Sequence, residues 1–352
     1  MATSLPTGLS NPRWDPWLLY DDGMYRAFYL SGRVDQSPWW KTSWICTATS
    51  TDMRRWQHHG AVLSPLQEST WESGRIFAGS AYVEKDAVSD AKTYYLFYSA
   101  ASASAIDHEH IGLATSSDGK RWQRSPRPLL SFSQSTGITT STGIGYAGRC
   151  NWNNHLHWRD PYVLHVPETQ QYYLFFCASV TAETRYQGGL GVAVSSTLGG
   201  PYQLLPPAAG PAITPEESPW PFYHLERPQV IHFGGQYHLF FSCFKDFVDP
   251  EWVTSERDKR VTDSTLYWYV SDRPTGPFRA ADSLPTVPGS ESTGLYGTTF
   301  SPQYPKSTWT QIAASQVASL NAIGWYSKTY QLEISQRFTA VWSNTDLRLV
   351  KH

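Results

Sequence analysis

Three short motifs in the sequence each place an acidic side chain one or two residues before a proline. They read Trp-Asp-Pro, Arg-Asp-Pro and Glu-Arg-Pro, and they supply Asp15, Asp160 and Glu226, each ten to twelve residues ahead of an aromatic run. Glycoside hydrolysis needs two carboxylic residues in different protonation states. One attacks or activates water, and the other protonates the leaving oxygen. If the fold brings the three acids together, the motifs predict a sugar-cleaving site.

Clustered carboxylates can supply that difference in protonation. Mutual repulsion raises the pKa of one member, while a neighbouring arginine keeps another ionised, and Arg159 and Arg227 each adjoin an acid. One such motif is usually only a turn or strand start, but three at matching positions of a repeat indicate a shared site. Proline lacks an N–H and disfavours helical backbone before it, so we expect stiff, extended chain at each acid.

The elements that must position these acids form a repeat. Aromatic runs recur about every 65 to 80 residues, each preceded by an apolar run and followed by a second strand-like run, a turn and an aromatic residue. The aromatic runs are 25–31, 95–99, 173–177 and 237–242, and the runs that follow are 44–50, 111–116, 190–195 and 266–271. Four antiparallel strands per unit are what a propeller blade requires.

Beyond residue 282 the chain has further apolar segments, at 310–314, 322–326, 331–334 and 340–342, which suffice for a fifth blade. We therefore predict an all-β fold, a single five-bladed β-propeller domain over residues 1–352 with four antiparallel strands per blade. The innermost strand of a blade lines the central channel. Acids at the starts of three inner strands should therefore converge at one end of that channel, where we expect the active site.

The composition excludes several function classes. The 352 residues carry a formal net charge of −2, with 16% charged and 15% aromatic side chains. Without a basic field or a long Lys/Arg run, nothing attracts a phosphate backbone, and flat rings suit sugars better. The apolar stretches are far shorter than the roughly 20 residues of a membrane-spanning helix. We expect a small saccharide as partner, and neither nucleic acid nor membrane.

The cellular location and the need for a cofactor are predicted from sequence motifs that would mark them. Residues 1–10 show no positive region followed by an apolar core, so a secretory signal is not expected and a cytoplasmic location is predicted. His155 and His157 form a close pair without a third ligand, so neither a metal nor another cofactor is predicted. Four cysteines, too few for a disulfide scaffold, are expected to be buried free thiols. They are Cys46, Cys150, Cys177 and Cys243.

In this order and spacing, the three motifs resemble the catalytic blocks of levansucrases, inulosucrases and related β-fructofuranosidases, the glycoside hydrolase clan shared with invertases. The resemblance spans residues 13 to about 300. Glu-Arg-Pro favours the levansucrase branch, because invertases typically carry Cys in place of this Arg. The resemblance implies that Asp15 is the nucleophile, that Asp160 stabilises the transition state and grips fructosyl hydroxyls, and that Glu226 is the general acid and base.

The resemblance also implies a set of substrate-binding residues around the acids. The segment 77–81, Phe-Ala-Gly-Ser-Ala, resembles a family block that supplies an aromatic wall and a polar contact near the fructosyl unit. A ring beside the nucleophile is expected to stack on sugar, and a basic residue and a tyrosine are expected near the glucose and the acids. The predicted set is Trp14, Phe77, Ser80, Arg159, His224, Arg227, Lys245 and Tyr296.

Two positions depart from the family pattern. Ala78 replaces a serine of the block, and His224 replaces a second glutamate two residues before Glu226. Both changes touch sugar binding, so they bear on the choice of donor and acceptor. The chain is also short for a levansucrase, which favours hydrolysis.

The mechanism implied is retaining double displacement, in which the nucleophile and the acid lie about 5 to 5.5 Å apart. Hydrolysis of sucrose and related β-fructosides, as by an invertase, is the expected reaction. Transfer of the fructosyl unit to a sugar acceptor uses the same residues and stays open. Two less favoured functions stay open as well. Glu-Arg-Pro argues against a related propeller arabinosidase or xylosidase, and three intact acids argue against a non-catalytic sugar-binding propeller.

Overall fold

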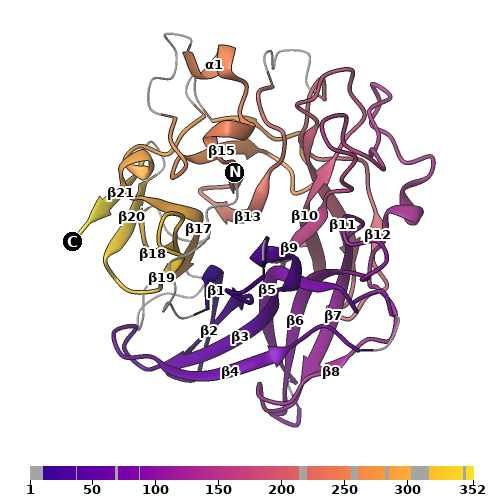
Figure 1. The fold of residues 1–352 in the computed structure, drawn as a ribbon. Helices are drawn as coiled ribbons and strands as arrows, with labels where there is room; N and C mark the ends of the chain where they lie inside the picture. Colours follow the sequence, from indigo (N-terminus) through magenta and orange to yellow (C-terminus); the bar gives the residue numbers. More distant parts are fainter. Residues whose placement is uncertain are drawn as a thin grey trace.

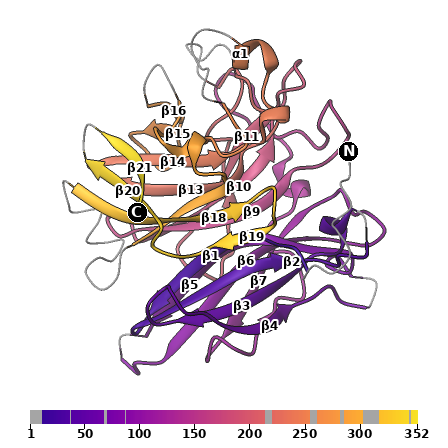
Figure 2. The same ribbon diagram turned by 60° about the vertical axis from the view of Figure 1, so that its left-hand side comes forward.

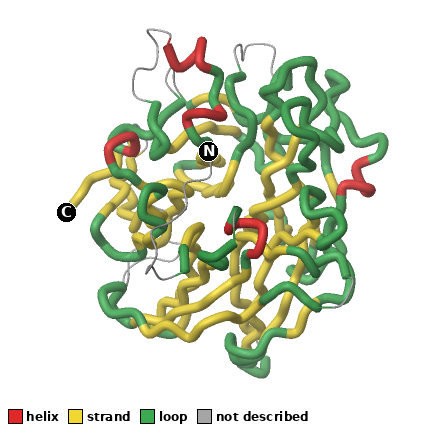
Figure 3. The backbone as a smooth tube through the Cα atoms, viewed as in Figure 1, coloured by secondary structure: helices red, strands yellow, loops and turns green. Residues whose placement is uncertain are grey.

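Five antiparallel sheets surround a central opening (Figure 1). The computed structural model describes residues 11–36, 38–67, 70–86, 88–213, 220–254, 261–281, 285–302, 317–343 and 346–352. Figure 3 shows strands dominating the described chain, with helical turns confined to the connections. The helical pieces are η1 (Trp39–Thr42), η2 (Phe132–Ser135), η3 (Lys245–Phe247), α1 (Pro250–Thr254) and η4 (Ser290–Ser292). None of the described helices has the length and apolar character needed to cross a membrane.

Each sheet is one blade and uses consecutive strands. Blade 1 contains β1 (Arg13–Asp21), β2 (Met24–Ser31), β3 (Trp44–Ser50) and β4 (Gln57–Leu63). Blade 2 contains β5 (Arg75–Lys85), β6 (Lys92–Ala101), β7 (His110–Ser116) and β8 (Gln123–Arg124). Blade 3 contains β9 (Trp158–Val166), β10 (Gln171–Ser179), β11 (Gly188–Ser195) and β12 (Gln203–Leu204).

The last two blades complete the ring. Blade 4 contains β13 (Glu226–Phe233), β14 (Gln236–Ser242), β15 (Leu266–Ser271) and β16 (Arg279–Ala280). Blade 5 contains β17 (Leu295–Pro302), β18 (Val317–Tyr326), β19 (Gln331–Glu333), β20 (Phe338–Ser343) and β21 (Leu347–Lys351). The predicted five-bladed, all-β propeller is confirmed, and the short β19 is an addition to the four-strand pattern of its blade.

The sequence located the strands of blades 1 to 4 better than those of blade 5. The aromatic runs became β2, β6, β10 and β14, and the runs after them became β3, β7, β11 and β15. In blade 5 the predicted segment 310–314 lies outside the described residues, and the inner strand β17 was not predicted. In its Leu-Tyr-Gly-Thr-Thr segment a glycine and two threonines interrupt the apolar residues, so the sequence shows no continuous apolar run.

Apolar cores fill the spaces between neighbouring blades. Between blades 3 and 4, for example, Phe175 and Val192 share one cluster with Val230 and Leu239, all fully buried. Comparable clusters join blades 1 and 2, blades 2 and 3, and blades 4 and 5. All four cysteines are buried and unpaired, as predicted. These inter-blade cores hold the inner strands in a fixed ring around the channel.

Blades 1 and 5 close the ring through side chains and a few hydrogen bonds, because each takes its strands from its own end of the chain. Figure 2 shows β18 and β19 beside β1. The Arg13 N–H donates to the Tyr330 carbonyl at 3.1 Å, and the Trp56 Nε1–H donates to the Ile334 carbonyl at 3.0 Å. A small core that includes Tyr25, Met53, Ile323 and Ile334 lies between them.

That closing core should contribute measurably to stability. Ile323 is 1% exposed, so Ile323→Ala removes buried methyl groups and leaves a cavity. We expect it to lower the free energy of unfolding by about 2 to 5 kcal/mol, measured by urea denaturation. Val88, 96% exposed, gives the matched control, and Val88→Ala should change stability by less than about 0.5 kcal/mol. Equal effects of the two variants would contradict closure through this core.

Candidate active site

The inner strands all bulge at the same height. In β1, β5, β9, β13 and β17, one extra residue interrupts the pairing with the next strand. The bulges lie after Trp14, Phe77, Arg159, Glu226 and Tyr296. A bulge bends its strand and redirects a side chain. Five bulges at one height therefore place a ring of redirected side chains at one end of the channel.

The residues before the three prolines are not extended, and that prediction was wrong. Asp15, Asp160 and Arg227 have φ values of 47°, 57° and 54°, in the left-handed region. Proline has no N–H to give to the ladder, so it sits where the bulge interrupts pairing. A non-glycine residue at positive φ costs on the order of 1 to 3 kcal/mol. The surrounding contacts must hold these three residues in place.

The strand register also corrects the expected equivalence of the three acids. Asp15 and Asp160 occupy the same position, directly before a proline, but in blade 4 that position belongs to Arg227. Glu226 stands one residue earlier, where the other blades have Trp14, Arg159 and Tyr296. Successive strand side chains point in opposite directions. Glu226 therefore approaches the aspartates from the neighbouring position, and an arginine replaces the third acid.

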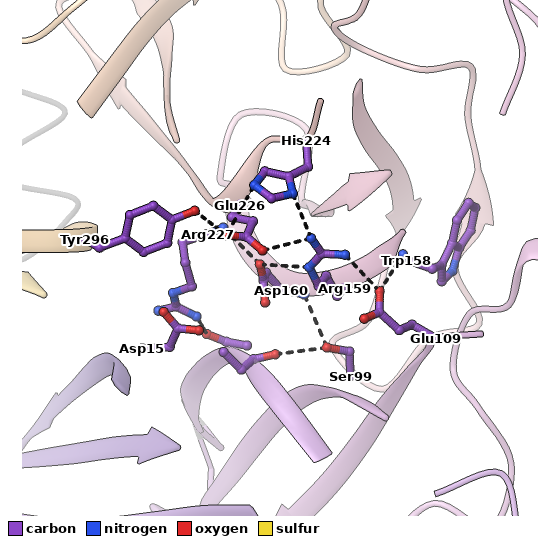
Figure 4. Close-up of polar contacts among 12 residues, drawn as sticks. Asp15, Ser99, Glu109, Trp158, Arg159, Asp160, His224, Glu226, Arg227 and Tyr296 are labelled. Atoms are coloured by element: carbon purple, nitrogen blue, oxygen red, sulfur yellow. Dashed lines mark hydrogen bonds and ion pairs between the residues drawn. The ribbon is translucent and has the colours of Figure 1, made fainter. Parts of the chain in front are cut away.

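Arg227 ties the bulges of four blades together (Figure 4). Its backbone N–H donates to Asp160 Oδ2 at 3.0 Å. Its Nη1 donates to the Gly79 carbonyl at 3.2 Å and its Nη2 to the Pro16 carbonyl at 3.1 Å. The side chain is buried, and its positive charge lies beside Asp15 and Asp160. It therefore compensates part of the negative charge that converges there.

Glu226 is held on both carboxylate oxygens. Arg159 Nη2 donates to Oε1 at 2.8 Å, and the Tyr296 hydroxyl donates to Oε2. His224 Nε2 lies 3.4 Å from Oε2. The Glu226 side chain is 20% exposed, against 5% for Asp160. Glu226 is thus the more accessible of these two acids, and its orientation is fixed.

Asp15 is oriented from blade 5. Trp325 Nε1–H donates to Asp15 Oδ1 at 3.0 Å. Gly297 lies beside this oxygen with φ of 61°, and a Cβ added there would stand 2.9 Å from Asp15 Oδ1. A side chain at this position would therefore displace the Asp15 carboxylate, and glycine leaves the space for it. Trp325 was not singled out from the sequence, since a tryptophan in an apolar strand carries no signal of a polar partner.

Burial sets the protonation of the acids. Burial, opposed first by Arg227 and reinforced by the charges of Asp160 and Glu226, raises the pKa of Asp15 from 3.8 to about 7. Burial likewise raises the pKa of Asp160 to about 6, against the opposing charges of Arg159 and Arg227. At Glu226 burial is outweighed by His224, Arg159 and the Tyr296 hydrogen bond, which lower its pKa.

The effect of His224 on the pKa of Glu226 depends on whether the imidazole is charged. Burial lowers the pKa of His224 to about 4, so the ring is neutral at pH 7 and adds no positive charge beside Glu226. At neutral pH, Arg159 and Tyr296 alone counter the burial of Glu226. The raised pKa values of about 7 and 6 leave Asp15 and Asp160 with about one proton between them from pH 6 to 7, whereas the lowered pKa of Glu226 keeps that carboxylate ionised. The acids thus differ in protonation, with the proton on the aspartates rather than on Glu226.

The other predicted substrate residues divide into two groups. Arg159, His224, Arg227 and Tyr296 contact the acids directly. Trp14 is 4% exposed and packs edge-on against Trp39 at 4.4 Å between ring centroids. The first four residues thus surround the trio, and Trp14 adjoins Asp15 along the chain.

The other three predicted residues make contacts with residues other than the acids. Phe77 carries the Arg75 guanidinium over its ring at 4.2 Å. Ser80 follows the bulge in β5, where its Oγ accepts from the Val163 N–H at 3.3 Å. Lys245 is exposed at the start of η3 and, within the described chain, has no contact with the acids. Ser80 and Lys245 are thus not brought together with the trio.

A large cavity lies on the other side of the bulges. It has a volume of about 790 Å³ and is lined by inner-strand residues that follow the bulges, such as Leu19, Val83, Leu164 and Ile231. Asp160 and Arg227 form part of its boundary. This cavity is the propeller channel. The acids with their arginines, rather than this cavity, form the candidate site.

Residues 14–187 match the sequence model described as the glycosyl hydrolases family 32 N-terminal domain. This part of the chain therefore belongs to glycosyl hydrolase family 32. The match covers the blocks of Asp15, Phe77 and Asp160, and Glu226 lies beyond it. No curated protein sequence matches this glycoside hydrolase.

Solved structures of the same fold resemble this glycoside hydrolase along nearly its whole length. An inulosucrase from Halalkalicoccus jeotgali bound to kestose is 18% identical, with a TM-score of 0.66, over 99% of this chain and 90% of that one. Bacillus subtilis levansucrase is 15% identical, with a TM-score of 0.66, over 97% and 86%. A family 32 β-fructofuranosidase from Bombyx mori is 16% identical, with a TM-score of 0.61, over 97% and 62%.

The raised pKa of Asp15 predicts how stability depends on pH. Because the folded pKa of about 7 exceeds the unfolded 3.8, the folded protein binds more protons between these values. Its stability therefore falls as pH rises through that window. Asp15→Asn removes the penalty, so its unfolding midpoint should exceed that of the wild type at pH 8 by about 2 °C or more. The difference should shrink toward pH 4.

Asp52 provides a control of opposite sign. Hydrogen bonds from the backbone N–H groups of Arg55 and Arg54 lower its pKa to about 2, so its ionised form stabilises the fold. Asp52→Asn should leave the midpoint at pH 8 unchanged or lower. If Asp15→Asn also lowered the midpoint at pH 8, Asp15 would be stabilised as an ion, contrary to the burial argument.

Proposed function

We propose that this glycoside hydrolase is a β-fructofuranosidase that cleaves sucrose and related β-fructosides with retention of configuration. The observation that carries the proposal is the convergence of Asp15, Asp160 and Glu226 around two buried arginines at one end of the channel. The relatives support the substrate class, since the inulosucrase structure is bound to kestose and a similar levansucrase is complexed with sucrose.

In the proposed reaction Asp15 attacks the anomeric carbon of the fructosyl unit while Glu226 protonates the departing oxygen. The product is a fructosyl ester of Asp15, which water then hydrolyses as Glu226 takes up its proton. Asp160 Oδ2 already accepts from the Arg227 N–H, so Oδ1 is assigned to a fructosyl hydroxyl. Burial places the proton on Asp15 in the protein without substrate, so the first step requires that Glu226 takes up a proton and Asp15 is ionised when the fructoside binds.

The contacts of Glu226 suit a residue that alternates between acid and base. When Glu226 gives up its proton, Arg159 and Tyr296 each donate to one oxygen of the carboxylate that forms. Hydrogen bonds from charged donors stabilise such a carboxylate more than neutral ones do. His224, neutral at pH 7, adds no second charge, so Glu226 remains basic enough to accept a proton from water.

A second candidate is transfer of the fructosyl unit to a sugar. It uses the same three acids, and the observation that favours it is the similarity to an inulosucrase and a levansucrase over 97 to 99% of the chain. The two reactions differ only in whether water or a sugar hydroxyl accepts the fructosyl unit from Asp15.

The direct test is to incubate the protein with sucrose and measure glucose and fructose over time. Equal release of both sugars is expected, with kcat reduced by about 10²-fold to 10⁴-fold in Asp15→Asn and Glu226→Gln. Glucose in excess of fructose would instead establish transfer. If sucrose, inulin and kestose all remain intact, the proposed function is wrong, and arabinosides and xylosides become the next substrates to test.

The coupled acids also predict the shape of the pH profile. Above about pH 7 the trio loses its last proton, so no acid remains for the leaving oxygen. Below about pH 6 a second proton binds, so that both Asp15 and Asp160 are neutral and no ionised nucleophile remains. We expect kcat/KM to follow a bell with limbs near these two values, measured at constant ionic strength from pH 4 to 9. Activity that stays constant up to pH 9 would contradict a shared proton.

A further inference from the structure

Glu109 is a buried carboxylate next to the site that the proposed mechanism does not use. It directly precedes β7 and is 2% exposed. Arg75 Nη2 donates to its Oε1 at 2.9 Å. Arg159 Nη1 donates to its Oε2 at 3.2 Å, and the Trp158 backbone N–H donates to the same oxygen at 3.1 Å. Glu109 therefore lies between two arginines, and one of them holds Glu226.

Arg159 uses its two terminal nitrogens for different carboxylates. Nη1 binds Glu109, whereas Nη2 binds Glu226 at 2.8 Å and lies 3.3 Å from His224 Nδ1 (Figure 4). A guanidinium is a planar, rigid fork, so fixing one nitrogen fixes the direction of the other. The position of Arg159 Nη2 against Glu226 is therefore set by the contact that Nη1 makes on its far side.

We propose that Glu109 is a positioning residue for the acid/base Glu226, acting through Arg159. Glu109 orients the guanidinium so that Nη2 faces Glu226. Its negative charge also compensates part of the positive charge of Arg159, which otherwise acts on Glu226 and Asp160. This inference rests on the proposed function for the role of Glu226. Its structural part, energetic coupling of Glu109 to Glu226, does not depend on the substrate.

The charges around Arg159 support this role. Burial lowers the pKa of Arg159, and the charges of Glu109 first and Glu226 later raise it well above its ordinary value. Arg75, Glu109, Arg159 and Glu226 thus form a chain of alternating charge through blades 2, 3 and 4. The groups that face Glu226 are His224, Arg159, Tyr296, Asp15 and Asp160, and those that face Glu109 are Arg75, Arg159, His110 and His155.

The first experiment compares pH profiles of sucrose cleavage. In Glu109→Gln the whole charge of Arg159 acts on Glu226 and Asp160, so the trio loses its last proton at lower pH. We expect the alkaline limb of kcat/KM to move down by about one pH unit, which is roughly a tenfold loss at pH values above the limb. Glu109→Asp keeps the charge and should restore the limb while lowering kcat.

Two further variants separate positioning from general damage to the fold. Glu72 matches Glu109 in burial at 2% exposed, and it is bound by Tyr98 at 2.7 Å and Arg124 at 3.0 Å. Glu72→Gln should leave the limb in place. Arg75→Gln should move the limb upward, because Glu109 then acts on Arg159 alone. An unmoved limb in both Glu109→Gln and Arg75→Gln would overturn the proposal.

The second experiment needs no substrate. Unfolding of Glu109→Gln, Glu226→Gln and the double variant forms a thermodynamic cycle, with Glu72→Gln replacing Glu109→Gln in a control cycle. Removing both carboxylates leaves Asp160, 3.9 Å away, as the remaining acidic partner of Arg159. Each variant changes the equilibrium constant for unfolding by some factor relative to the wild type. The factor for the double variant should exceed the product of the two single-variant factors by about fivefold. An additive result would overturn the coupling; a coupled cycle without sucrose cleavage would refute only the proposed function.

Discussion

The repulsion between three largely buried carboxylates is the constraint on which the channel mouth depends. Removing charges from water is costly unless opposite charges and hydrogen bonds compensate them. Arg227 and Arg159 provide that compensation from within the protein, and neither is free to swing away, since carbonyl groups or a second carboxylate bind its other nitrogens. The compensation is incomplete, which is why a proton remains among the acids near neutral pH.

The inner strands of all five blades share a β-bulge. A single extra residue in each inner strand opens the ladder at the same height, and the side chain at that point varies with the blade. It is an acid in blades 1 and 3, an arginine in blade 4 and a glycine in blade 5. The propeller thus repeats a geometry, and the chemistry comes from which residue each repeat places there.

Sequence reasoning recovered the blade repeat, the three acids and most of their arginines, because aromatic runs and proline motifs are local signals. It missed the one-residue offset of Glu226, since a bulge register depends on pairing with the next strand rather than on spacing along the chain. It also missed Trp325 and Glu109, whose partners lie 310 and 50 residues away in sequence. A tryptophan in an apolar strand and a lone glutamate before a strand carry no local signal, because only the folded propeller brings their partners close.

Ring closure without a shared strand gives the two chain ends an unusual relation to the site. Asp15 belongs to the first strand and Trp325, which orients it, to one of the last blade's strands, so this contact crosses the seam. Separation of blades 1 and 5 would break the hydrogen bond that orients Asp15 while leaving every sheet intact. The contact between the first and last blades therefore links the closure of the ring to the geometry of the candidate site.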